Sequence, residues 1–250
     1  MSSQILFKKQ YQVDLRDVDF TKRLKLSSLF TYFQDTANHA ATSLGLGIEK
    51  LRNDGLTWIL IRIRVEINRI PSLNEKITIE TWPQPPSRLE FERDFLVKDE
   101  NGNVLIKAIS NWIIMDIHNR KLKRTESLGI HYPEVIEERA LKDYPLKKLK
   151  DIENLEPVYE KVIGYSDIDI NGHLNNSKYM DYIMDCYPVE SHLLYDVKMI
   201  EVNFINEALP NEKIMLLKGM EESEIYINGI NQNNKKVVFK SKVLIEKKNL

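Results

Sequence analysis

A stretch near the start of the chain recurs in its second half, and this internal repeat limits the fold more than any other feature of the sequence. Residues 17–35 and 167–185 align without a gap at an offset of 150 residues. Matched pairs include Asp17/Asp167, Asp19/Asp169, Leu24/Leu174, Tyr32/Tyr182 and Asp35/Asp185. Further on, residues 74–77 match residues 211–214 at an offset of 137. A repeat of this length predicts two similar half-domains fused in one chain.

Each copy of the repeat predicts a polar turn followed by an amphipathic helix. In the first copy, apolar residues recur at helical spacing from Leu26 to Leu44, with Ser27 or Ser28 as the expected cap and Gly45 as the stop. In the second copy, Asn171-Gly172 predicts a chain reversal, and a helix is expected to start near residue 176.

The remaining pattern of the first half indicates strands. Runs rich in Ile, Val, Thr and aromatic residues predict an antiparallel meander, with a hairpin at Asn101-Gly102; the runs cover 57–68, 75–82, 89–98 and 103–116. A helix followed by antiparallel strands is an α+β order. The sequence is expected to divide into a first half over 1–124, a surface connector over 125–157 and a second half over 158–250.

Composition excludes several classes of protein. The 36 basic and 37 acidic side chains leave a net charge of -1, which argues against bulk nucleic-acid binding. The single cysteine, Cys186, excludes an intrachain disulfide, and no His or acidic cluster has metal-ligand spacing. No apolar run approaches the roughly 20 residues that span a bilayer. The prediction is a cytoplasmic protein without a metal, a cofactor or membrane insertion.

The repeat also separates residues needed by the fold from residues needed by chemistry. Asp169 recurs as Asp19, so its expected role is a turn hydrogen bond from side chain to backbone. Three polar residues of the second half have no equivalent in the first. In the alignment of the two copies, Asn171 is matched with Thr21, His173 with Arg23 and Glu207 with Ile70. These three residues are therefore the candidates for chemistry.

The same residues resemble a known family. The run from Asp169 to Tyr179, with Glu207 placed 34 residues after His173, is similar to the active-site pattern of the acyl-acyl carrier protein thioesterases. The first half also resembles that family at Gly55–Trp58, Ile79–Pro83, Arg93–Phe95 and Ser110–Trp112. The resemblance covers residues 5–247. It implies a tandem hot-dog fold, in which each half is a long helix wrapped by an antiparallel sheet, and the lack of a transit peptide suggests a bacterial member.

The resemblance implies hydrolysis of the thioester of fatty acyl-acyl carrier protein, giving free fatty acid in fatty acid biosynthesis. It assigns catalysis to Asp169, Asn171, His173 and Glu207 in the second half, and an acyl-chain pocket to the first half. The implied partner is an acyl carrier protein with a phosphopantetheine-linked acyl chain, and association into a homodimer is left open. The basic clusters 120–124 and 147–150 are either solvated charge or a docking surface for that acidic carrier.

Two mechanisms and several rival functions stay open. In one mechanism Glu207 and His173 activate water, Asn171 positions water or the carbonyl, and backbone N–H groups of residues 174–177 hold the oxyanion. In the other, Asp169 is a covalent nucleophile, which its recurrence as Asp19 disfavours. The rival functions are an acyl-coenzyme A thioesterase of the hot-dog type, a hydratase, and a non-catalytic acyl-binding protein.

Overall fold

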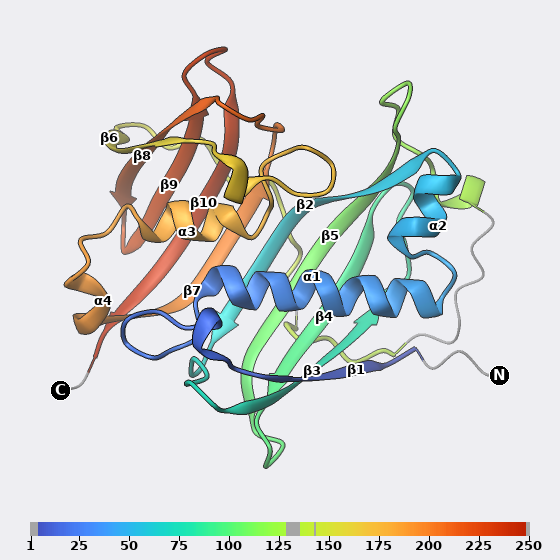
Figure 1. Ribbon diagram of the computed structural model, residues 1–250, viewed down its shortest axis with the longest axis horizontal. Helices are drawn as coiled ribbons and strands as arrows, with labels where there is room; N and C mark the ends of the chain where they lie inside the picture. Colours follow the sequence, from blue (N-terminus) through green and yellow to red (C-terminus); the bar gives the residue numbers. More distant parts are fainter. Residues whose placement is uncertain (1–4, 129–135, 143, 249–250) are drawn as a thin grey trace.

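The computed structural model describes residues 5–128, 136–142 and 144–248, and its strands form one antiparallel sheet (Figure 1). The first half contributes β1 (Phe7–Gln12), β2 (Leu56–Ile67), β3 (Lys76–Pro83), β4 (Phe91–Lys98) and β5 (Val104–Asp116). The second half contributes β6 (Glu156–Val162), β7 (Tyr195–Phe204), β8 (Lys213–Glu221), β9 (Glu224–Asn231) and β10 (Val237–Lys247). The helices are α1 (Leu26–Ser43), α2 (Ile48–Asn53), α3 (Lys178–Met184) and α4 (Ser191–Leu194).

The strand order shows the repeat directly. It runs β1-β3-β4-β5-β2 in the first half and, mirrored, β7-β10-β9-β8-β6 in the second. The two halves join where β2 pairs with β7, from Arg62 opposite Asn203 to Glu66 opposite Met199. Only β3, β4 and β5 form the predicted meander, because β2 lies on the far side of β5, where it can reach the other half. The predicted α+β double hot-dog is confirmed.

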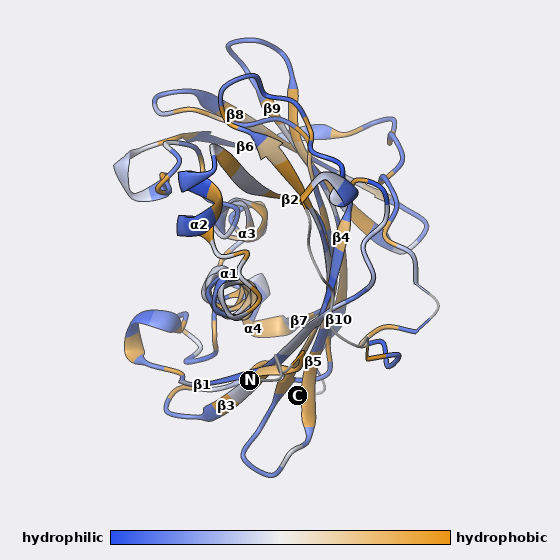
Figure 2. Cartoon of the chain, turned by 90° about the vertical axis from the view of Figure 1, so that its right-hand side faces the viewer, coloured by the Kyte–Doolittle hydropathy of each residue, from blue (hydrophilic) through white to orange (hydrophobic). Residues whose placement is uncertain are grey.

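The helices lie on one side of the sheet, which curves around them (Figure 2). α1 buries an apolar stripe that includes Phe33 and Ala37, and core residues of both halves belong to one cluster. The helix ends as predicted, with Gly45 at a φ of 75°. The predicted serine caps are wrong, because the helix already begins at Leu26 and Lys25 is its N-cap. None of the helices in the described ranges is long and apolar enough to cross a membrane.

The second helix differs from the prediction in length. α3 has 7 residues where α1 has 18, and a short segment with α4 leads from α3 to β7. The predicted start near residue 176 lies two residues before the observed start at Lys178. The smaller offset of the later match, 137 against 150, already indicated that the second half has fewer residues between helix and sheet.

The described part of the connector packs on the face of the sheet away from the helices. Along β7, Ile200 and Val202 point into the core, so Asn203 points to the opposite face, where its Oδ1 accepts a hydrogen bond of 2.7 Å from the backbone N–H of Leu149. The Trp82 indole donates to the carbonyl of Glu138 on the same face. Residues 129–135 and 143 of the predicted connector lie outside the described residues.

Candidate active site

The loops that precede α1 and α3 have the same backbone hydrogen bonds. The N–H of Asp169 donates to the carbonyl of His173 at 2.9 Å, and Asp19 donates to Arg23 at the same distance. Gly172, at a φ of 79°, makes the tight reversal that the Asn-Gly pair predicted. The sequence repeat is therefore a repeat of backbone geometry, and the loop at 169–173 is set by the fold.

The Asp169 side chain is committed to this loop. Its Oδ1 accepts the N–H groups of Asn171 at 2.8 Å and of His173 at 3.4 Å, and its Oδ2 accepts the Asn171 side-chain amide at 3.3 Å. Asp19 accepts the N–H groups of Thr21 at 2.7 Å and of Arg23 at 3.4 Å in the same way. The predicted turn hydrogen bonds are present in both copies.

His173 and Glu207 come together at the end of this loop. The His173 Nε2 lies 3.5 Å from the Glu207 Oε2, within ion-pair distance and longer than a good hydrogen bond. A bond of 2.9 Å from the N–H of Leu174 to the carbonyl of Ala208 joins the residues that follow each of them. The fold therefore places the imidazole beside the carboxylate, although the two residues are 34 positions apart.

A third residue, which the sequence reasoning missed, belongs to the same cluster. The Nη2 of Arg120 donates to the Oε2 of Glu207 at 2.7 Å. Arg120 comes from the turn that follows β5, in the other half of the chain. The sequence placed it in a basic cluster, and no local pattern could have found this contact, because the two residues are 87 positions apart.

A pocket with a volume of about 860 Å³ opens at this cluster. Asp169, Asn171, His173, Glu207 and Arg120 all line it. The other walls are largely apolar and come from both halves; they include Ala37, Ala41, Trp58, Phe91, Trp112, Tyr179 and Phe204. The pocket touches five strands that are neighbours in the sheet, in the order β3-β4-β5-β2-β7. At the usual strand spacing these five strands span roughly 19 Å.

The aromatic wall is held rigidly. Trp58 meets Phe91 edge to face at 4.9 Å between ring centroids, and its indole N–H donates to the carbonyl of Leu46 at 2.8 Å. The indole N–H of Trp112 likewise donates a hydrogen bond to the hydroxyl of Ser110 at 2.8 Å. The polar atoms of both tryptophans are thus satisfied by the protein, and their rings can present an apolar surface to a ligand.

The expected oxyanion donors are mostly in use. The N–H of Leu174 donates to Ala208, that of Asn175 to the carbonyl of Asp167, and that of Ser177 to the side chain of Asn175. Within the described residues, only the N–H of Asn176 among positions 174–177 has no such acceptor, and Asn176 lines the pocket. The structure therefore reduces the predicted set of four backbone donors to one.

Cys186 takes no part in this cluster. It is buried outside the pocket, and its thiol donates to the carbonyl of Tyr182 at 3.3 Å. Burial raises the pKa of the Cys186 thiol to about 12, so the thiolate, which is the nucleophilic form, is disfavoured at neutral pH.

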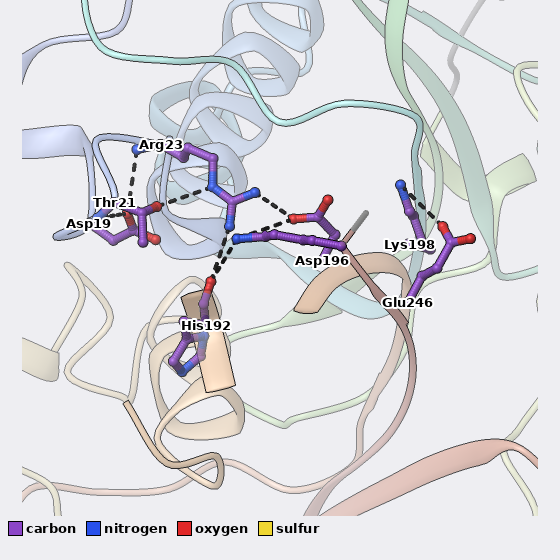
Figure 3. A network of polar contacts seen from close by, with 8 residues as sticks. Asp19, Thr21, Arg23, His192, Asp196, Lys198 and Glu246 are labelled. Carbon is purple, nitrogen blue, oxygen red and sulfur yellow. Dashed lines mark hydrogen bonds and ion pairs between the residues drawn. The ribbon is translucent and has the colours of Figure 1, made fainter. Parts of the chain in front are cut away.

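The matching loop of the first half carries an ion-pair network (Figure 3). Arg23 occupies the position of His173, and its guanidinium pairs with Asp196 and donates to the carbonyl of His192. Lys248 donates to the same carbonyl at 2.9 Å. The two loops therefore share a backbone but differ in chemistry: one ends in an imidazole and a carboxylate, the other in a salt bridge.

The fold and the site together define a double hot-dog protein in which a histidine and a glutamate meet on the lining of a largely apolar pocket. Comparison with known families is more specific. The family model of the acyl-ACP thioesterase N-terminal domain matches residues 4–128, and that of the acyl-ACP thioesterase C-terminal domain matches residues 153–247. The chain belongs to the acyl-ACP thioesterase family.

Individual relatives agree with this assignment. The crystal structure of an acyl-ACP thioesterase from Bacteroides thetaiotaomicron is 28% identical, with a TM-score of 0.83 over 98% of this chain and all of that one. The 12:0-ACP thioesterase from Umbellularia californica shares the fold, with a TM-score of 0.85 at 20% identity over 98% of each chain. The chloroplastic oleoyl-acyl carrier protein thioesterase of Coriandrum sativum is 25% identical over 87% of this chain. The chain spans 63% of the length of that plant protein.

Proposed function

We propose that this protein hydrolyses the thioester of a fatty acyl chain on acyl carrier protein, releasing free fatty acid and the carrier. The observation that carries the proposal is the His173–Glu207 pair at 3.5 Å, at the mouth of a pocket of about 860 Å³. An apolar pocket of this size suits an acyl chain, and an imidazole with a carboxylate suits proton transfer at its thioester. Family membership supports the same reaction.

The proposed reaction is one addition followed by one elimination. Water, activated by His173 and Glu207, attacks the carbonyl carbon, and its proton passes to the pair. Negative charge then develops on the carbonyl oxygen, where the N–H of Asn176 and the side chain of Asn171 can donate hydrogen bonds. The carbon–sulfur bond breaks as the oxyanion collapses, and the proton held by the pair goes to the leaving thiolate. The products are a carboxylic acid and a free thiol.

The role proposed for Asp169 is to hold the loop that carries His173. Both carboxylate oxygens already accept hydrogen bonds from that loop. Asp19 has the same backbone bonds in a loop that lacks the histidine. Water activation is therefore favoured over attack by Asp169 itself, which would form an anhydride.

The division of labour between the halves follows the sequence prediction. In this proposal residues 1–124 hold the acyl chain and residues 158–250 carry the catalytic residues, with 125–157 as the connector. The lining supports it, because most of the apolar wall residues, such as Trp58 and Trp112, belong to the first half, although Tyr179 of the second half also lines the pocket, and His173 and Glu207 come from the second.

The carrier protein is proposed to dock around the pocket mouth. Lys121 and Arg124 are exposed in the segment that follows Arg120, and Arg52 donates to the carbonyl of Ile170 on the rim. The cluster at 147–150 is a poor candidate, because its segment packs on the opposite face of the sheet. A cytoplasmic location stays a prediction from sequence. Association into a homodimer was left open by the sequence, and size-exclusion chromatography with light scattering measures it.

The test follows the thiol released by the purified full chain. Acyl-acyl carrier protein and acyl-coenzyme A of several chain lengths are compared under the same conditions. We expect kcat/KM to be highest for a carrier-bound chain. Glu207→Gln and His173→Asn are each expected to lower kcat by about 10²-fold or more, the usual scale of acid–base contributions.

His39→Gln is the matched control for the histidine change. His39 is exposed on α1 and does not line the pocket, so this variant should keep full activity. Full activity in Glu207→Gln would refute water activation. Faster turnover of acyl-coenzyme A would favour that substrate, and acyl binding without thiol release would favour a binding protein.

A further inference from the structure

The backbone of Arg120 is held in a tight, hydrogen-bonded turn after β5. The residue adopts a φ of 54°, in the left-handed region that non-glycine residues rarely occupy. Its N–H donates to the carbonyl of Asp116 at 3.0 Å, and the Oδ1 of Asp116 accepts the N–H groups of His118 and Asn119. The N–H of Ile117 donates to the carbonyl of Gly55 at 2.9 Å, which ties the turn to the start of β2.

From this turn the guanidinium of Arg120 reaches one carboxylate oxygen of Glu207. The Oε2 of Glu207 accepts the Nη2 of Arg120 at 2.7 Å, and the same oxygen faces the Nε2 of His173 at 3.5 Å. Within the described residues, the two carboxylate contacts of Glu207 are thus this arginine and this histidine. The other basic residues of the cluster behave differently: Lys123 pairs with Asp116, and Lys121 does not line the pocket.

The pair is too exposed to serve folding. The side chain of Arg120 is 60% exposed and that of Glu207 is 37% exposed, and such surface ion pairs add little to stability. A glutamate on a loop has several rotamers, and only some of them face the imidazole. The guanidinium of Arg120 limits that freedom, because it binds the same Oε2 oxygen that faces the imidazole of His173.

We propose that Arg120 is the positioning residue for Glu207, supplied by the first half of the chain to a catalytic pair in the second. Arg120 acts through the Glu207 carboxylate, whose Oε2 is in contact with both Arg120 and His173. The inference rests on the proposed hydrolysis and deepens it. In this proposal both halves supply the site, because most of the apolar pocket walls and one member of the polar cluster come from the first half.

The experiment compares Arg120→Met, Arg120→Lys and the matched control Arg16→Met in the full chain. Arg16→Met makes the same change at an exposed ion pair with Asp14, and Arg16 does not line the pocket. The substrates are acyl-acyl carrier protein and the same acyl chain on free pantetheine, which has no protein to dock. Arg120→Met is expected to lower kcat by about threefold to fivefold on both substrates, because an exposed ion pair can shift the rotamer population of Glu207 by no more than about that factor, while each KM changes less than about twofold.

Two further readouts separate positioning from other roles. Arg120→Lys should recover part of kcat, because a single donor and the charge remain. Arg120→Met combined with Glu207→Gln should be no slower than Glu207→Gln alone, because the arginine acts only through that carboxylate. The melting temperature of Arg120→Met should stay within about 4 °C of the wild type, as expected for an exposed pair in a chain of this size.

Several outcomes would overturn the inference. A KM increase confined to the carrier substrate would make Arg120 a docking residue, and additive losses in the double variant would make it independent of Glu207. If Arg120→Met is as active as the wild type while Glu207→Gln is impaired, the hydrolase proposal stands and this inference falls. If the wild type releases no thiol from any substrate, the hydrolase proposal itself fails.

Discussion

The two aspartates of the repeat allow a direct test of covalent against positional catalysis. Asp169→Asn keeps an Oδ1 that can accept the N–H groups of Asn171 and His173, but loses the charge and the second acceptor. Asp19→Asn makes the same change in the loop that ends in Arg23. The two variants should therefore affect folding alike and activity differently.

The expected size follows from the hydrogen bonds. A bond to a charged acceptor contributes roughly 1.5–3 kcal/mol and a bond to a neutral acceptor roughly 0.5–1.5, so each substitution should cost about 1 kcal/mol. That corresponds to a fall in melting temperature of about 2–4 °C in a chain of this size. If the whole loss at Asp169 misplaces His173 in the transition state, kcat/KM falls by roughly fivefold to tenfold. Asp19→Asn should leave kcat/KM unchanged.

The assay is thiol release from acyl-acyl carrier protein, with thermal unfolding of the same preparations. A covalent mechanism predicts a different result, because removal of a nucleophile costs on the order of 10⁴-fold or more. A loss above about 10³-fold in Asp169→Asn, at a melting temperature equal to that of Asp19→Asn, would refute the positional role. A labelled acyl group trapped on Asp169 would do the same.

Two further predictions concern the pocket and the first loop. Ala41 lines the pocket, so Ala41→Phe should shorten the longest acyl chain that the enzyme accepts. Each excluded methylene should cost about 0.8 kcal/mol, or roughly fourfold in kcat/KM. An unchanged kcat/KM profile across a series of chain lengths would argue against this pocket as the acyl site. Burial tends to raise the pKa of Asp196, but the hydrogen bond and charge of Arg23 outweigh it and lower the pKa. Stability from this pair is thus present above the ordinary aspartate pKa and is lost as the pH falls through the lowered pKa of Asp196. Arg23→Met should therefore cost about 0.5–1 kcal/mol in urea unfolding at pH 7 and less at pH 3, without loss of activity; equal costs at both pH values would contradict the assignment.

The architecture was predictable because it repeats a local pattern. The gapless match between 17–35 and 167–185 records two identical turns, and their backbone bonds are the same in the structure. The apolar stripe from Leu26 and the strand runs also reflect spacing that a single segment already shows. The serine caps failed because the helix begins at Leu26, so that Lys25, and not Ser27 or Ser28, is its N-cap.

Part of the candidate site was also predictable from the sequence. The positions of Asn171, His173 and Glu207 stand out in the sequence because the other copy lacks them. The link through Leu174 and Ala208 then brings the last two together, by a bond that both halves share, since Leu24 donates to Pro71 at 2.9 Å. Here the sequence held enough information, because duplication preserved the scaffold and left the differences visible.

The residue pattern alone was enough to predict two related halves and to show that a histidine and a glutamate stand at the positions of His173 and Glu207 only in the second, where the first has Arg23 and Ile70. Three features required the folded chain: the contact of Arg120 with Glu207, the place of residues 147–150 on the far face of the sheet, and the hydrogen bonds that already occupy three of the four expected backbone donors. The reason is physical: spacing along the chain encodes contacts within a turn, a helix or a repeated unit. A contact between residues 87 positions apart depends instead on how β5 and its following turn meet the second half across the sheet.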